Sequence, residues 1–207
     1  MAESQKIRKR RLSYSDLSLD DLKRSFGLSL DTLDLFGKIA PVEPDDWLTE
    51  TLRKGQTLAP VSEKARAEFI IAPILLFIRD LLHESITLYS GVRFDVAPEK
   101  GLKGVCDFII AKSPPLPTIQ APVLVMVEAK KNDIEEGLGQ CAAEMVAAQI
   151  FNQRERQDAR TIYGCVTTGE TWQFLQLEGA RLTIDKARYF IVNVEKILGI
   201  LFHILSS

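Results

Sequence analysis

Two short apolar runs joined by a proline-rich segment constrain the fold of this 207-residue chain more than any other feature. Residues 105–111 and 123–127 are rich in valine and isoleucine, and their length and composition favour β-strands over helices. Pro114, Pro115 and Pro117 lie between the runs and cannot donate to a sheet ladder, so they mark a connection. The sequence therefore predicts a β-hairpin.

Two acidic residues, Asp107 and Glu128, lie symmetrically about this connection. The midpoint of positions 107 and 128 is 117.5, so antiparallel pairing places their carboxylates opposite each other, away from the loop. Because side chains alternate along a strand, Glu128 and Lys130 share a face and Ala129 points away. Two acids and a lysine are costly at the end of apolar strands unless they are used. They suit a hard divalent cation and a polarised water.

The overall composition predicts one sizeable core. Hydrophobic residues make up 46% of the chain and charged residues 26%, which is ordinary for a globular domain. We interpret residues 61–207 as this domain and residues 1–60 as an N-terminal helical extension packed on it. The net charge of −2 gives no global positive field, so nucleic-acid binding would need a local basic patch.

The three cysteines, Cys106, Cys141 and Cys165, are an odd number without CxxC spacing. This pattern argues against a disulfide framework or a zinc knuckle and favours a reducing, cytoplasmic location. The longest apolar run, residues 69–78, is interrupted by proline, and the basic N-terminus lacks a following apolar segment. We therefore expect neither a membrane span nor a secretory signal.

The N-terminal region contains a basic cluster at residues 6–11 (KIRKRR), which is either a solvated arm or a phosphate-contacting one. Leucines and a phenylalanine recur at near-helical spacing over residues 13–36, with Ser18 and Ser29 as candidate caps of short helices. After two prolines, the acids at residues 45–46 are expected to open another helix.

Residues 62–82 are predicted to form the first long helix, bent at Pro73. Glu68 is the notable residue on this helix, because its neighbours three, four and seven positions on are all apolar. It is interpreted either as part of a site or as a rim residue paired with Lys64 or Arg66.

The remaining chain alternates between strand and helix patterns. Residues 87–97 predict a strand with a bulge or bend at Gly91, and residues 134–156 a helix with Gln140 and Glu144 on one face. Later elements are expected at residues 161–168, 172–177 and 182–184 (strands) and 193–205 (helix). This order predicts an α/β fold with a central mixed β-sheet flanked by helices.

These residues together resemble the PD-(D/E)xK nuclease superfamily, which has the restriction-endonuclease-like fold. The resemblance covers roughly residues 62–177. Its carriers are Glu68 on the first helix, Asp107 on the second strand, Glu128-Ala129-Lys130 on the third strand, and Gln140 on the following helix. The E-x-K triplet alone is a weak signal, but the aspartate on the paired strand and the glutamine-bearing helix make it fairly specific. Cys106 replaces the proline of the name, which the superfamily tolerates.

The resemblance implies a metal-dependent hydrolase of phosphodiester bonds, with DNA favoured over RNA as its substrate. Asp107 and Glu128 would bind Mg²⁺ or Mn²⁺, and the carbonyl oxygen of Ala129 would be a further ligand. Lys130 would orient or help deprotonate the attacking water and stabilise charge on the phosphate.

The resemblance also implies two supporting roles. Glu68 would contact the metal through water or position a ligand, and Gln140 would hold Lys130 or the substrate. Two other functions stay open, namely a catalytically inactive module of the same fold that binds nucleic acid or protein, and a hydrolase of a smaller phosphoester. A homodimer is also left open.

Other motifs give weaker predictions. Residues 137–142 match G-x-G-x-x-A, but they do not follow directly on a strand end as a dinucleotide site requires. His83 and His203 lie in apolar helical contexts and are interpreted as core-edge residues, so a zinc hydrolase with histidine ligands is disfavoured. Trp47 and Trp172 are interpreted as packing residues, with base stacking as the less favoured alternative.

Overall fold

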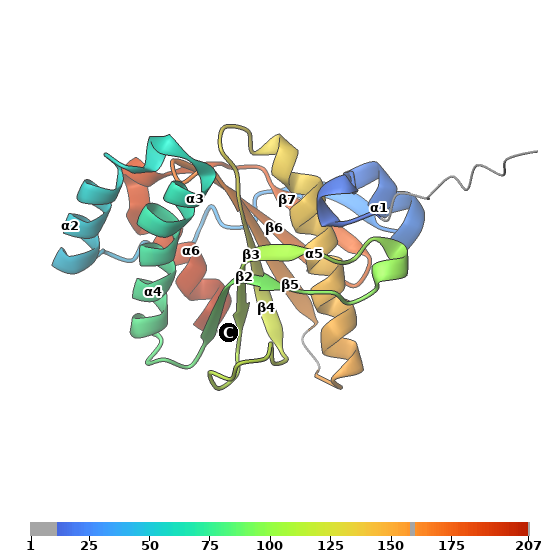
Figure 1. Ribbon diagram of the computed structural model, residues 1–207. Coiled ribbons are helices and arrows are strands. Elements are labelled where there is room, and N and C mark those ends of the chain that lie inside the picture. Colours follow the sequence, from blue (N-terminus) through green and yellow to red (C-terminus); the bar gives the residue numbers. More distant parts are fainter. Residues whose placement is uncertain (1–11, 158–159, 207) are drawn as a thin grey trace, which may run out of the picture.

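The computed structural model describes residues 12–157 and 160–206 and has three layers. An eight-stranded mixed β-sheet lies between two groups of helices (Figure 1), which confirms the predicted α/β class. None of the helices in the described ranges is long and apolar enough to cross a membrane.

The sheet has the order β1-β7-β6-β5-β4-β3-β2, and β8 pairs with β6. The β1–β7 and β4–β5 pairs are parallel and the other pairs are antiparallel, so the sheet is mixed as predicted. The strands are β1 (Ser29–Leu33), β2 (Thr87–Arg93), β3 (Val105–Ala111), β4 (Val123–Ala129), β5 (Thr161–Thr167), β6 (Thr171–Glu178), β7 (Arg181–Asp185) and β8 (Tyr189–Phe190).

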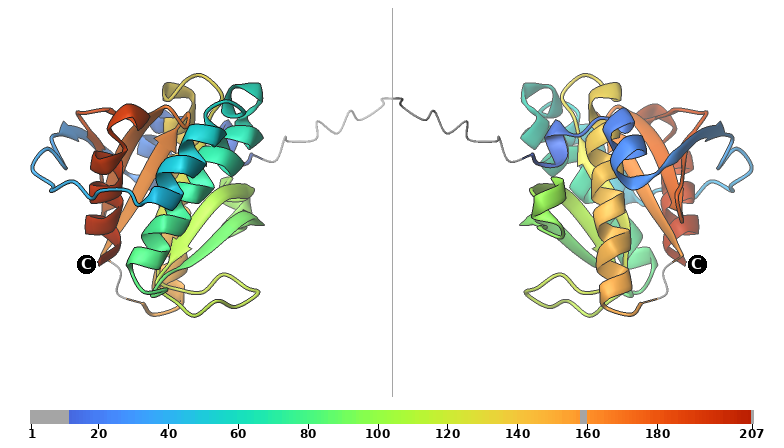
Figure 2. Two further views of the ribbon diagram at one scale, coloured as in Figure 1. Left: turned by 90° about the vertical axis from the view of Figure 1, so that its left-hand side faces the viewer. Right: turned by 90° about the vertical axis from the view of Figure 1, so that its right-hand side faces the viewer.

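Each face of the sheet has its own hydrophobic core. Helices α5 (Glu135–Arg154) and α1 (Leu19–Phe26) cover one face. The other face is covered by α2 (Asp46–Gly55), α4 (Ala72–Leu81) and α6 (Val194–Ser206). The two side views of Figure 2 show these groups separately. Residues from β3 and β4 enter both cores, so this hairpin is buried on both faces.

The predicted helix over residues 62–82 is present but interrupted. It consists of α3 (Glu63–Arg66), a π-helical turn (Ala67–Ile71) and α4, and the Ser62 hydroxyl caps its start by accepting from Ala65 N at 3.0 Å. Pro73 has no N–H for the Phe69 carbonyl four residues earlier. That carbonyl packs closely against Gly55 of α2, where an added Cβ would lie only 2.2 Å from the oxygen. Where the sequence predicted a bend at Pro73, the helix contains a π turn that ends at Ile71, two residues before the proline.

The N-terminal region departs from the helical extension that we predicted. Ser18 does cap α1, accepting from Asp21 N at 3.2 Å. Ser29, however, begins β1, which runs parallel to β7 as an edge strand, and Ser29 N donates to the carbonyl of Ala180. All five β1 side chains are exposed, so pairing with the open edge of β7 overrides the local leucine spacing. The basic cluster at residues 6–11 lies outside the described residues.

The hairpin register agrees with the symmetry argument. Phe108 pairs with Val127 and Ile109 with Met126. The same register, continued by one residue, places Asp107 opposite Glu128. The prediction that these two acids lie on adjacent strands is confirmed.

Candidate active site

Asp107 ties the start of β3 to the end of β4. Its Oδ2 accepts a hydrogen bond from the backbone N–H of Ala129 at 2.8 Å. Burial raises the pKa of Asp107 above its usual value, although this N–H bond opposes the increase. The nearby charge of Glu63 also raises the Asp107 pKa. A bound cation near Asp107 would therefore be stabilised by both carboxylates.

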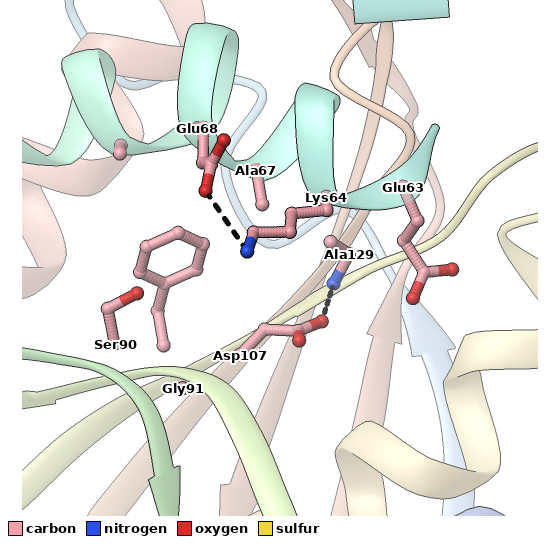
Figure 3. A pocket seen from close by; sticks show the side chains of 10 residues that line it. Glu63, Lys64, Ala67, Glu68, Ser90, Gly91, Asp107 and Ala129 are labelled. Atoms are coloured by element: carbon pink, nitrogen blue, oxygen red, sulfur yellow. Dashed lines mark hydrogen bonds and ion pairs between the residues drawn. The ribbon is translucent and has the colours of Figure 1, made fainter. Parts of the chain in front are cut away.

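A cavity of about 310 Å³, here called the Asp107 cavity, opens beside this carboxylate. Figure 3 shows it between the helix that begins at α3 and the strands below. Its lining comprises Glu63, Lys64, Ala67, Glu68, Ala72, Ser90, Gly91, Asp107, Phe108 and Ala129. Gly91 has a φ of +63°, but β2 keeps one register with β3 on both sides of it, so the predicted bulge is absent and only the backbone conformation is special there. Three of the predicted site residues therefore border one cavity.

Glu68 lies at the rim of the cavity. It forms an ion pair with Lys64, one of its two predicted partners, with 3.7 Å between Oε1 and Nζ (Figure 3). Its side chain is 54% exposed although its helical neighbours Ile71 and Leu75 are buried. The π turn accounts for this difference, because it changes the helical phase that the sequence pattern assumed.

Glu63 is an acidic residue of the site that the sequence analysis missed. Its carboxylate projects from the start of α3 toward the strands (Figure 3), and its charge raises the pKa of both Asp107 and Glu128. The available signal was its position directly after the Ser62 cap, where an acid is also explained by the helix dipole alone.

On the α5 side of β4, four polar side chains form a continuous hydrogen-bonded chain. Lys130 Nζ donates to Glu128 Oε1 at 2.5 Å and to Gln140 Oε1 at 3.1 Å. Gln140 Nε2 in turn donates to Glu144 Oε1 at 3.2 Å. The backbone of Lys130 is fixed by its own N–H, which donates to the carbonyl of Thr167 at 2.8 Å. Of the two roles implied for Gln140, holding Lys130 or holding the substrate, the structure contains the contact with Lys130 as a direct hydrogen bond.

Glu128 is almost fully buried and its ionisation is strongly perturbed. Burial, and then the negative charge of Asp107, raise the pKa of Glu128 to about 7, against the opposing effect of Lys130. Its Oε2 is buried and has no hydrogen-bond partner within residues 12–157 and 160–206. The Asp107 carboxylate of the cavity and the Glu128 carboxylate of the buried chain therefore repel each other.

The glycines of the G-x-G-x-x-A motif have packing roles. A Cβ at Gly137 would lie 3.1 Å from Lys130 Cγ and 2.4 Å from Val166 Cγ1, so the missing side chain makes room for the lysine stem. A Cβ at Gly139 would lie 2.4 Å from the Leu17 carbonyl oxygen. Close packing of α5 therefore explains both glycines without a dinucleotide.

The donor groups at this site are mostly carboxylate and carbonyl oxygens. No cluster of three or more histidine, cysteine, aspartate or glutamate side chains suited to hold a metal lies in the described part of the chain. The three cysteines are buried and unpaired, in agreement with the absence of a disulfide framework. Any ion here would be held by two carboxylates, a backbone carbonyl and water, an arrangement compatible with Mg²⁺.

Comparison with known proteins assigns no family. No family model matches the chain, and no curated protein matches it.

The raised pKa of Glu128 predicts that the metal-free protein loses stability as the pH rises. The unfolded chain loses this proton near pH 4.5 and the folded chain near pH 7, so the folded state binds more protons in between. This contribution is fully present below pH 4.5 and is lost as the pH rises to about 7. The difference corresponds to roughly 3 kcal/mol.

Glu128→Gln removes the titrating group and keeps an acceptor for Lys130. Urea unfolding in EDTA should therefore show a smaller loss of stability between pH 5 and pH 7.5 in the variant than in the wild type. Both proteins share every other titrating group. Equal losses in the two proteins would contradict the assigned pKa.

Proposed function

We propose that this protein is a divalent-metal-dependent nuclease with a restriction-endonuclease-like core, hydrolysing phosphodiester bonds of nucleic acid and favouring DNA. The observation that carries the proposal is the placement of the Lys130 ammonium. It is held by Glu128 and Gln140 at the end of the same strand whose Ala129 N–H binds Asp107. A cation fixed beside two carboxylates suits a site that handles both a metal and an anion.

The donor groups fit Mg²⁺ or Mn²⁺. Asp107, Glu128 and the Ala129 carbonyl supply oxygen ligands, which hard divalent ions prefer. Glu128 Oε2 is a buried acceptor without a partner in the described ranges, and the raised pKa values of both acids indicate a need for positive charge. When bound, the ion would polarise a water molecule and neutralise charge on the phosphate.

Lys130, Asp107 and Gln140 would then have separate roles in the reaction. Burial alone would lower the pKa of Lys130, but the charge and hydrogen bond of Glu128 outweigh it and raise that pKa. Lys130 therefore stays positively charged, which favours orienting the water and stabilising the phosphate over acting as a base. Asp107 keeps its position through Ala129 N–H, and Gln140 holds the lysine head group.

A catalytically inactive module of the same fold is the second candidate. The observation that favours it is the 2.5 Å contact between Lys130 and Glu128, which already neutralises one of the two carboxylates without a metal. In that case Lys130 would be a structural partner of Glu128, and the site would have no catalytic role.

Incubation of the purified protein with supercoiled plasmid in Mg²⁺ or Mn²⁺ tests the proposal. Nicking that is lost in EDTA and in Asp107→Asn is expected. Parallel reactions with single-stranded RNA and with bis-p-nitrophenyl phosphate identify RNA or small phosphoesters as the preferred substrate. Retention of labelled DNA without cleavage in either ion would favour the inactive module.

A further inference from the structure

We infer that Glu144 is a positioning residue, which fixes the Gln140 amide so that its carbonyl oxygen faces the ammonium of Lys130. The catalytic consequence rests on the proposed nuclease function, whereas the positioning itself follows from the hydrogen bonds. Glu144 Oε1 accepts from Gln140 Nε2 at 3.2 Å, and Gln140 Oε1 accepts from Lys130 Nζ at 3.1 Å.

The chemistry of the amide explains what this contact does. A glutamine side chain can present either its oxygen or its NH₂ group, but only the oxygen accepts from an ammonium group. A half-turn of the Gln140 amide would place one donor against another at Lys130. The carboxyl oxygen of Glu144 is an acceptor on the NH₂ side, so it selects the productive orientation.

Stability does not explain a carboxyl group at position 144. The side chain is fully buried, and its Oε2 has no partner that meets the geometric criteria for a hydrogen bond within the described residues; the Cys106 thiol lies near enough for Glu144 to raise the Cys106 pKa. Burial, followed by the charge of Glu128, raises the pKa of Glu144 well above its usual value. Burying such a group costs free energy that an apolar side chain would not. Residues that lower stability in this way are typical of functional sites.

Asn152, on the same helix, is a buried polar residue with a structural role and serves as a comparison for Glu144. Its Oδ1 accepts from Val123 N at 2.8 Å and its Nδ2 donates to Val123 O at 2.7 Å. Both of its hydrogen bonds join α5 to the backbone of β4. Glu144, in contrast, makes no side-chain hydrogen bond to the backbone of residues 12–157 and 160–206, and its Oε1 accepts from Gln140, the residue that holds Lys130.

Cleavage assays on three variants test the inference. Glu144→Leu should lower kcat about tenfold to a hundredfold, the usual cost of removing a hydrogen-bond partner from a residue that orients a catalytic group, with KM within about twofold and the melting temperature unchanged or raised. Glu144→Gln keeps an acceptor for Gln140 and should restore most of the lost rate. Asn152→Ala is the matched control and should lower the melting temperature by several degrees with little change in kcat.

A double-mutant cycle separates positioning from a general structural effect. If Glu144 acts through Gln140, adding Glu144→Leu to Gln140→Ala should cause little further loss of kcat. If the kcat of the double variant falls by the product of the two single losses, the inference is overturned. A kcat of Glu144→Gln as low as that of Glu144→Leu would overturn it as well.

A measurement without activity keeps the inference distinct from the proposed function. The side-chain amide signal of Gln140 in ¹⁵N NMR, assigned by its loss in Gln140→Ala, should move strongly in Glu144→Leu and much less in Glu144→Gln. If the wild type does not cleave but the signal behaves in this way, the nuclease proposal fails and the positioning stands. An unchanged signal in Glu144→Leu would overturn the positioning, whatever the activity.

Discussion

Lys130→Met is expected to lower the rate of DNA cleavage at least about a hundredfold, a typical loss for a positioned catalytic group. Methionine keeps much of the alkyl stem that packs over Gly137 and removes the charge near Glu128 and Gln140. Folding should be retained. Divalent-ion binding should be unchanged or slightly stronger, because a competing positive charge is gone. Plasmid nicking, thermal unfolding and calorimetric titration with Mn²⁺ measure the three effects.

Lys131→Met is the matched control, because Lys131 is the exposed neighbour of Lys130. It should cleave at the wild-type rate. Unfolding of the Lys130→Met protein would assign the lysine a structural role. Cleavage by that variant at the wild-type rate would contradict the mechanism.

Asp107→Asn should remove both cleavage and the stabilisation of the protein by divalent ions. An ion that binds only the folded site stabilises it by about 1.4 kcal/mol at ten times its dissociation constant. For a domain of this size, that corresponds to a rise of roughly 3–6 °C in melting temperature. The asparagine keeps an oxygen for Ala129 N–H, so the metal-free variant should be at least as stable as the wild type. Thermal unfolding with and without millimolar Mg²⁺ measures both the metal-free stability and the stabilisation by the ion.

Asp31→Asn provides the comparison, since Asp31 is an exposed acid on β1, at the opposite end of the sheet from β2. That variant should keep the full increase in melting temperature. If the wild type gains nothing from either ion, Asp107 and Glu128 do not form a metal site that matters to the folded protein.

The hairpin and its acids could be predicted from the sequence because their signals are local. Proline fixes the loop, the symmetric spacing fixes the register, and strand alternation separates Glu128 and Lys130 from Ala129. The pairing of Phe108 with Val127 confirms this part of the prediction. The four-residue spacing of Gln140 and Glu144 likewise placed both on one helix face, and they form a hydrogen bond.

Other features depend on contacts between distant segments. Ser29 has the local pattern of a helix cap, yet the open edge of β7 makes it the start of a strand. The exposure of Glu68 follows from the π turn at residues 67–71. Within that turn, the carbonyl of Phe69 packs on Gly55, which lies fourteen positions earlier in the sequence. Glu63 belongs to the site because α3 begins near the end of β4, a placement that no sequence spacing encodes.

A crystal soaked in Mn²⁺ tests the central claim, a single metal site shared by Asp107 and Glu128, most directly. The account predicts an anomalous peak within about 2.0–2.6 Å of oxygen atoms from both carboxylates, with the Ala129 carbonyl as a further ligand. Lys130 should lie beside the ion without ligating it. At a saturating concentration, a peak bound to one of the two acids alone, or no peak in the Asp107 cavity, would contradict it.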